Sequence, residues 1–416
     1  MSDAATGERD DRDEGAEYGT SAARDARTAG ERRFWRWTAV GLGAIAFGKG
    51  IREPNAWPYT HAQLNYSAGF IRRGLYGAAL GHPLGLHLYG HYVVVSTVLL
   101  LLLFAALVLL ARSSKLAERT PPGELLAVFS SSYGVSYLAS LNGYLDISLA
   151  LLCVAPLFVR RTGWRLAVAA VTTVVGILIH EQFCFAYLPL LVVSVLFGAA
   201  TAKSVAERRL AWGGGVLLVA LGLGLMTYMS LHVSVTAAQT EVLRQSMART
   251  ADRPLDKEVL KVLNFTPRQN LEIMQSVWRR PTYPIAQGES LLLFGPTAAV
   301  LSWATLLLLR RWMPGKHRWL YAGVLLGTLS PLSLHLMGWD KNRWNEMLCL
   351  NAFLMLLLVS RLLGAEAVQL PVRLRRACVL VMLLNMASGG VMMDDRQIRP
   401  FPFMHNPDAA SVLISH

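Results

Sequence analysis

The stretch HYVVVSTVLLLLLFAALVLLA, residues 91–111, decides the fold, because it holds no Asp, Glu, Lys or Arg over a length that crosses a bilayer. Similar apolar runs recur from Trp35 to Met393 and predict an all-α, polytopic integral membrane protein with about eleven transmembrane helices. The predicted spans are residues 35–49, 91–111, 124–141, 145–159, 165–180, 183–199, 210–231, 289–309, 318–338, 345–363 and 374–392.

Composition favours the same class of protein. Hydrophobic residues make up 53% of the chain and charged residues only 16%, a balance more apolar than that of soluble domains. Residues 1–33 mix both signs of charge with Gly, Ala and Ser and lack the apolar core of a signal peptide, so we expect a disordered cytoplasmic tail there. Residues 34–393 form the predicted transmembrane helical domain. The excess of Arg over Lys and the abundance of Ala and Leu hint at a bacterial cell membrane.

Alternate connections between the spans are rich in Lys and Arg, which predicts that they face the cytoplasm. They contain Arg112/Lys115/Arg119, Arg160/Arg161/Arg165, Lys203/Arg208/Arg209, Arg310/Arg311/Lys316/Arg318 and Arg361/Arg373/Arg375/Arg376. The N-terminus is then cytoplasmic, and the tail 394–416 is extracytoplasmic. Two long outer segments, 51–90 and 232–287, lie on the same outer side, and the second is long enough to form a cap with helices of its own.

Polar residues of several kinds gather in the connections that are predicted to face outward. The candidate substrate-binding cations are Arg72, Arg73, Lys341 and Arg343, and the candidate aromatic contacts for a sugar are Tyr66, Tyr144, Trp339 and Trp344. The candidate catalytic residues are Glu53, Asp146, His180, Glu181 and Asp340. Guanidinium groups bind phosphate in a bidentate way, and a carboxylate or imidazole accepts a proton from a hydroxyl group. This pattern predicts an outward site for an anionic ligand.

Each of these residues also has a purely structural interpretation. Arg72 and Arg73 are equally explained as interfacial anchors whose side chains reach toward lipid phosphates. Each carboxylate is equally explained by an ion pair with a nearby arginine or by a helix end, and Asp146 suits the helix dipole at the start of its span. The functional interpretation requires that these scattered residues meet in one cavity.

Other chemistries have little support in the sequence. The four cysteines fall inside apolar spans without a paired spacing, and there is no P-loop, no dinucleotide-binding motif and no HExxH, so we expect no cofactor and no metal site. A requirement for a divalent metal stays open. The formal net charge of +13 lies mainly in short loops and not in a basic patch with interleaved aromatics, so nucleic acid is not an expected partner.

Three outward motifs carry a resemblance to known enzymes. They are Phe70-Ile-Arg-Arg-Gly-Leu-Tyr-Gly77, His180-Glu181 and Trp339-Asp-Lys-Asn-Arg-Trp344. A polytopic chain with these motifs resembles bacterial membrane enzymes that build surface polysaccharides, the Wzy/EpsG-type polymerases and, more broadly, the GT-C glycosyltransferases. The resemblance implies a polyprenyl-phosphate or polyprenyl-pyrophosphate sugar donor, a glycan acceptor and glycosyl transfer on the outer face. GT-C enzymes usually carry an Asp-x-Asp-like pair in the first outer loop, where this chain has Glu53 alone.

A different class, a transporter or flippase for a lipid-linked or anionic solute, stays open as the alternative. Transporters often contain internal repeats and charged, broken helices near the midplane of the membrane. No repeat relates the two halves of this chain, and its charges cluster at one interface. A third class, a non-catalytic partner in a membrane assembly, does not explain why acidic and basic residues converge on the outer side.

Overall fold

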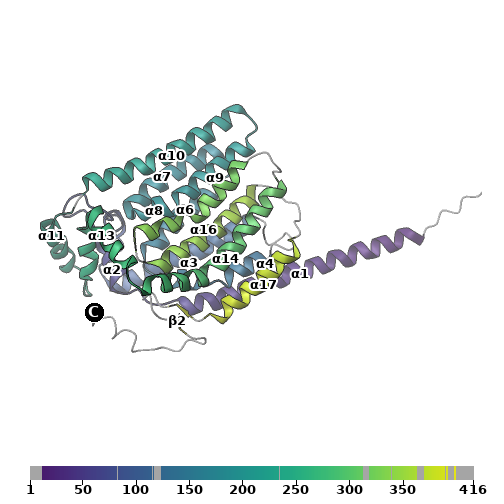
Figure 1. The fold of residues 1–416 in the computed structure, drawn as a ribbon, viewed down its shortest axis with the longest axis horizontal. Helices are drawn as coiled ribbons and strands as arrows, with labels where there is room; N and C mark the ends of the chain where they lie inside the picture. Colours follow the sequence, from purple (N-terminus) through teal and green to yellow (C-terminus); the bar gives the residue numbers. More distant parts are fainter. Residues whose placement is uncertain are drawn as a thin grey trace, which may run out of the picture.

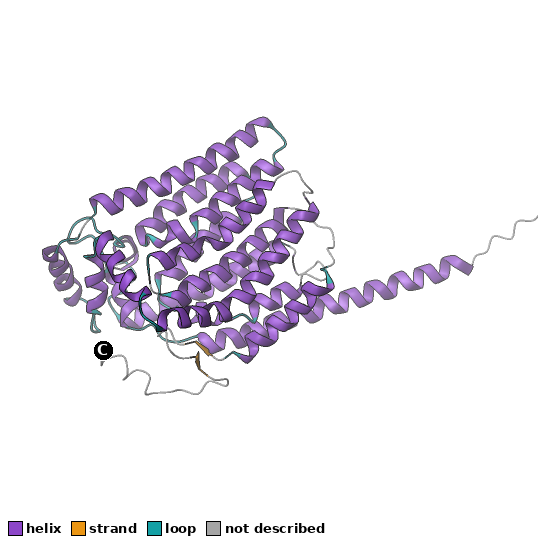
Figure 2. Cartoon of the chain, in the orientation of Figure 1, coloured by secondary structure: helices purple, strands orange, loops and turns teal. Residues whose placement is uncertain are grey.

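The computed structural model describes residues 12–81, 83–114, 116, 123–233, 235–312, 318–338, 340–362, 370–388, 390–391 and 398–399. Helices make up most of this part of the chain (Figure 2). A pair of two-residue antiparallel strands, β1 (Gly390–Val391) and β2 (Ile398–Arg399), is the only sheet among the described residues. The all-α class that the hydropathy pattern predicts is therefore confirmed.

The elements fall into two sets, before and after the connection that follows the long helix α10. The first set is α1 (Arg12–Gly50), α2 (Ala56–Gln63), the π-helical turn η1 (Gly77–Gly81), α3 (Tyr89–Ser113), α4 (Gly123–Ser130), α5 (Tyr133–Ser140), α6 (Leu145–Leu157), α7 (Thr162–Ile179), α8 (Gln182–Ala186), α9 (Leu188–Thr201) and α10 (Val205–His232). The later helices are α11 (Ala237–Ala248), α12 (Lys257–Leu263), α13 (Pro267–Trp278), α14 (Thr282–Trp312), α15 (Arg318–Leu329), the 3-10 helix η3 (Ser330–Leu336), α16 (Lys341–Leu362) and α17 (Val372–Ala387).

Several of these helices are long and apolar enough to cross a membrane. Among the described residues five meet this condition by length and composition, or six if the bent pair α5 and α6 counts as one span. The five are α3, α7, α10, α14 and α15 with its continuation into η3. Ten of the eleven predicted spans lie mainly on one helix or on two consecutive helices, whereas the last, 374–392, runs past the end of α17 at Ala387 to the strand β1. Their number as complete crossings and their orientation stay predictions.

Three predicted spans are interrupted, for local reasons. Residues 124–141 divide where Ser132 caps α5 by accepting a hydrogen bond from the N–H of Val135. Residues 183–199 divide at Tyr187, between α8 and α9. Residues 318–338 change from α-helix to 3-10 helix next to Pro331, which has no N–H to continue the α-helical pattern. Interrupted helices leave backbone groups that buried side chains can bond.

The prediction of disorder over residues 1–33 is wrong for its second part, because residues 12–33 lie in α1, which continues without a break to Gly50. Residues 1–11 lie outside the described part. The physical reason is that Ala, Glu and Arg, which dominate this segment, have high helix propensity although the segment as a whole is polar. Arg375 bonds both Glu31 and Glu124, so α1 is also held beside α17 and α4.

Helix α16 is the buried centre of the bundle and packs against α14, α15, α9 and α5. Most of its residues are buried, including several polar ones near its first turns. Asn351 donates hydrogen bonds of 2.7 Å and 3.0 Å to the carbonyls of Ala186 and Gly327, and so satisfies backbone groups at two helix ends. A helix surrounded by protein on all sides tolerates polar side chains that lipid would not.

The helices α11 to α13, which we call the cap, lie at one end of the bundle, and the N-terminal part of α1 projects from the opposite end (Figure 1). Helix α7 connects the two ends, with Arg160 and Arg161 before it and His180 after it. The basic loop is therefore at the far end from the cap, as the charge pattern predicts for opposite sides of a membrane.

We expect the substitution Gly50→Ala to destabilise the contact between α1 and α5. A Cβ atom at Gly50 would lie 1.7 Å from the backbone oxygen of Ser136, so the helices must separate, at a cost of about 1–3 kcal/mol for overpacking. Gly48 is the matched control in the same helix, because a Cβ there meets nothing within 4 Å. Thermal unfolding in detergent should give a lower midpoint for Gly50→Ala than for Gly48→Ala. Equal midpoints would contradict this close packing.

Candidate functional site

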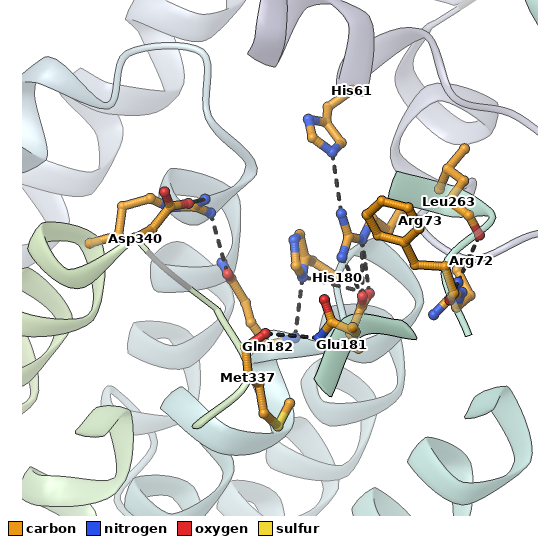
Figure 3. Close-up of polar contacts among 12 residues, drawn as sticks. His61, Arg72, Arg73, His180, Glu181, Gln182, Leu263, Met337 and Asp340 are labelled. Carbon is orange, nitrogen blue, oxygen red and sulfur yellow. Dashed lines mark hydrogen bonds and ion pairs between the residues drawn. The ribbon is translucent and has the colours of Figure 1, made fainter. Parts of the chain in front are cut away.

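A cavity of about 420 Å³ lies between the cap and the adjoining ends of the bundle helices. It is bounded by α2 and the loop after it, the start of α6, the turn between α7 and α8, α13, and the segment from η3 to the start of α16. Its ionisable and amide side chains include His61, Arg72, Arg73, Asp146, His180, Glu181, Gln182, Asn270, Asp340 and Arg343. Segments far apart in the sequence therefore contribute to one site (Figure 3).

The first cluster of the cavity is built on an ion pair between Arg73 and Glu181. The Nε of Arg73 donates to both carboxylate oxygens, at 3.1 Å and 3.0 Å, and its Nη2 donates to Oε1. Two histidines flank this pair, since His61 Nε2 lies 3.4 Å from Arg73 Nη1 and His180 Nδ1 lies 3.6 Å from Glu181 Oε2. The bidentate geometry fixes the guanidinium plane in the cavity.

Arg73 adopts an uncommon backbone conformation. Its φ of 64° is the only positive φ of a non-glycine residue among the described residues. The left-handed region is sterically unfavourable for residues with a Cβ and costs of the order of 1–3 kcal/mol. The conformation turns the chain between Arg72 and Gly74, and the ion pair with Glu181 is the contact that holds it.

Burial and charge set the protonation of this cluster. Burial alone would raise the pKa of Glu181, but Arg73 and His180 hold that pKa well below its usual range. Burial and the charge of Arg73 lower the pKa of His61 to about 3 and also lower the pKa of His180. The Nδ1 of His180 accepts the N–H of Gln182 at 3.2 Å. At neutral pH the cluster therefore holds a carboxylate, a guanidinium and two neutral imidazoles.

The second cluster centres on Arg343, at the start of α16. Its Nη2 donates to both oxygens of Asp146, at 3.1 Å and 2.8 Å, and its Nη1 donates to Asp340 at 2.7 Å. Gln182 bridges the same groups, because its Nε2 donates to Asp146 Oδ1 at 2.8 Å while its Oε1 lies 3.3 Å from Arg343. The rings of Tyr144 and Trp344 lie 5.4 Å and 5.1 Å from the guanidinium carbon.

Arg72 differs from the other two arginines of the cavity. Its Nη2 donates to the backbone carbonyls of Leu263 at 2.7 Å and Phe265 at 3.0 Å, which are neutral groups at the end of α12. Its Nε is buried without a hydrogen-bond partner among the described residues. Because no described contact joins Arg72 to a carboxylate, its charge is not directly neutralised as those of Arg73 and Arg343 are.

The three carboxylates of the cavity differ in exposure. The side chain of Asp340 is 39% exposed, against 17% for Glu181 and 2% for Asp146. Asp146 is held behind Arg343, and Glu181 is held in the fork of Arg73. Asp340 is therefore the carboxylate that a hydroxyl group in the cavity reaches most easily.

The structure brings most of the predicted site residues together, but not all. Lining the cavity are Arg72, Arg73, Tyr144, Asp146, His180, Glu181, Asp340, Arg343 and Trp344. Glu53 is exposed in the loop after α1, Tyr66 stacks on Phe70, and Lys341 is buried in α16, and none of these three lines the cavity. Trp339 lies outside the described residues. The four cysteines are buried, free thiols.

Three further residues belong to this region and were not among the predicted ones. His61 and Gln182 are neutral side chains in short helices, and nothing in the hydropathy pattern distinguishes them. Glu346 is a buried carboxylate three residues after Arg343, inside a predicted span. A carboxylate within a span is itself a signal of function, so Glu346 was detectable from sequence.

Comparisons with protein-family models, with curated proteins and with solved structures find no match to this chain. The resemblance to polysaccharide polymerases and GT-C enzymes therefore rests on the sequence motifs alone. Among the described residues no group of three His, Cys, Asp or Glu side chains is arranged to hold a metal ion.

We expect Glu181→Gln to destabilise the protein at neutral pH by about 2–3 kcal/mol, because Arg73 loses its counter-charge. The loss is smaller than for a fully buried pair, because the two side chains are 14% and 17% exposed. The folded-state pKa of Glu181 is lowered, so the pair stabilises the fold fully above about pH 4.5, and this contribution is lost as the pH falls through the lowered pKa. Thermal unfolding at a series of pH values should therefore give midpoints for wild type and variant that converge in acid.

The control for this experiment is Glu272→Gln, which removes the partner of Arg268 in an exposed ion pair with side chains 89% and 59% exposed. Exposed pairs contribute about 0–1 kcal/mol, so the control should unfold close to wild type at every pH. If both variants lower the unfolding midpoint equally, the buried pair of Arg73 and Glu181 stabilises the fold no more than an exposed pair does.

Proposed function

We propose that this protein is a membrane glycosyltransferase or polysaccharide polymerase that uses a polyprenyl-phosphate- or polyprenyl-pyrophosphate-linked sugar on the extracytoplasmic face. The observation that carries the proposal is one cavity lined by three arginines and by Asp340, the most exposed carboxylate of the cavity, which Arg343 bonds. A volume of about 420 Å³ is within the range of small-molecule sites and accommodates a sugar with its phosphate groups.

The proposed topology has eleven membrane crossings, a cytoplasmic N-terminus and the cap outside. It is supported by the position of most apolar runs on one or two helices and by the separation of the basic loop before α7 from the cap. Helices such as α16, which is too polar for lipid, would cross inside a ring of more apolar helices. The cavity would then open at the outer membrane interface, where a lipid-linked donor presents its sugar.

In this proposal Arg72 and Arg343 bind the phosphate groups of the donor. Arg72 has no carboxylate partner among the described contacts, and Arg343 is oriented by Asp146 and Asp340. A guanidinium held by fixed partners needs no rearrangement to stabilise the charge that develops on a leaving phosphate. Apolar side chains of the cavity, including Met226, Leu271 and Leu336, offer a surface for the first isoprene units.

The proposed reaction is a displacement at the anomeric carbon. The oxygen of the acceptor hydroxyl forms a bond with that carbon, and the bond from the carbon to the phosphate oxygen breaks with its electron pair on the phosphate. Asp340 takes the hydroxyl proton as general base. Tyr144 and Trp344, which flank Arg343, would contact the sugar ring. Glu181 and His180 orient Arg73, and the Glu181 side chain is 17% exposed against 39% for Asp340, so an acceptor hydroxyl reaches Asp340 more easily.

The variant Asp340→Asn should lower the rate of transfer by about a hundred- to ten-thousand-fold, because it removes the general base and keeps the shape of the side chain. Glu53→Gln is the contrast, since Glu53 is exposed outside the cavity and should leave transfer unchanged. Transfer is measured in membrane vesicles supplied with a panel of polyprenyl-linked sugars. A loss in Glu53→Gln with full activity in Asp340→Asn would reverse the assignment of the base.

Undecaprenyl phosphate and undecaprenyl pyrophosphate should stabilise the detergent-purified protein against heat, because a ligand that binds only the folded state raises its apparent stability. We expect Arg72→Gln to reduce this stabilisation strongly, since Arg72 supplies the least neutralised positive charge of the cavity. Arg268→Gln, at an exposed position of α13, is the matched control and should respond like wild type. No stabilisation of the wild type by either lipid would count against a polyprenyl-linked donor.

One observation favours the second candidate, a transporter or flippase for a lipid-linked or anionic solute. Helices α5 and α6 are bent by 119° at a break beside the cavity, and the α8–α9 region is interrupted nearby. Broken helices around a charged site are typical of transporters. Movement of a labelled polyprenyl-phosphate sugar across proteoliposomes, without transfer of the sugar, would favour this candidate.

A further inference from the structure

Glu346 is a carboxyl group in an environment that does not favour its charge. It lies in the first half of α16, is 1% exposed and has no ion pair among the described residues. Its Oε2 atom is buried without a hydrogen-bond partner in the described part of the chain. An ionised carboxylate removed from water without a cation or donors is strongly unfavourable.

The titratable groups that interact electrostatically with Glu346 come from three places, and Arg343 is the one cation among them. They are Asp146 from α6, Tyr187 between α8 and α9, and Arg343 and Cys349 from α16 itself. Residues three apart share one face of a helix, so Glu346 lies about one turn further along α16 than Arg343, on the same face. The Arg343 guanidinium, however, already bonds Asp146, Asp340 and Gln182. A charged Glu346 would place three carboxylates around one arginine.

We propose that Glu346 holds a proton at neutral pH and serves as a positioning residue of the site, keeping Arg343 directed toward Asp340 and the cavity. In the neutral form Arg343 keeps two carboxylate partners. Loss of the proton would add a negative charge directly behind the arginine, draw the guanidinium inward and repel an anionic ligand. The part of this inference that concerns anion binding rests on the proposed function, and the part that concerns the proton does not.

The proton is tested without any ligand. Infrared spectra of wild type at neutral pH should contain the C=O stretching band of a protonated carboxylic acid, and Glu346→Gln should remove it. Glu346→Gln should also unfold at or above the wild-type temperature, because a neutral amide replaces a neutral acid of the same shape. Absence of the band, or a midpoint lowered as for a broken ion pair, would overturn the inference.

Glu124→Gln is the matched control for these measurements. Glu124 is also 1% exposed and also lies in a helix, but it is bonded at 2.8 Å by Arg375. Its substitution removes one of the two carboxylates that Arg375 bonds, so it should lower the unfolding temperature and leave the infrared band of the protonated acid in place. Loss of the band in Glu124→Gln would show that the proton lies on Glu124 and not on Glu346.

The role in anion binding is tested with inorganic pyrophosphate as the probe. As the pH is raised until the infrared band disappears, the affinity of wild type should fall by about tenfold relative to Glu346→Gln, the effect of one added charge near the ligand. Comparison with the variant cancels the ionisation of pyrophosphate itself. Parallel pH profiles would refute the positioning role. If neither protein binds pyrophosphate while the band is present, the proposed function fails and the proton assignment stands.

Discussion

The cost of removing charge from water is the constraint on which the polar part of this structure depends. A charged side chain inside an apolar helix bundle is stable only when another charge or a set of dipoles faces it. Arg343 satisfies this condition with Asp146 and Asp340, and Arg73 satisfies it with Glu181. The first pair joins α16 to α6, and the second joins the loop after α2 to the turn after α7. The ion pairs therefore also fix how these helix ends are arranged.

The same constraint explains why the interrupted helices gather near polar side chains. A helix end exposes carbonyls and N–H groups that lipid cannot bond. Asn351 bonds two such carbonyls, and Arg72 bonds two more at the end of α12. The central helix α16 carries these polar groups because other helices surround it, and its burial removes any need for an apolar surface.

Hydropathy predicted where the apolar helices lie, because a run such as residues 91–111 has few alternatives in a membrane. It did not predict the breaks at Ser132 and Pro331, which depend on caps and on single backbone groups. The charged residues of the site were predictable, since charge beside a span is rarely accidental. Their partners were not, because Arg73 and Glu181 meet across 108 positions of sequence, and the place of Glu53 just after a span does not determine which way it points.

Ion pairing within the cavity is compatible with anion binding, because the carboxylates neutralise Arg73 and Arg343 but not Arg72. The carboxylates of Asp146 and Glu181 lie behind or beside the guanidinium groups that they orient, while Arg72 bonds only neutral carbonyls of the cap. Arg72 therefore links segment 51–90 to segment 232–287 and also supplies positive potential to the cavity. An anion bound there would strengthen the contact between the loop after α2 and α12, and by linkage that contact would favour binding of the anion.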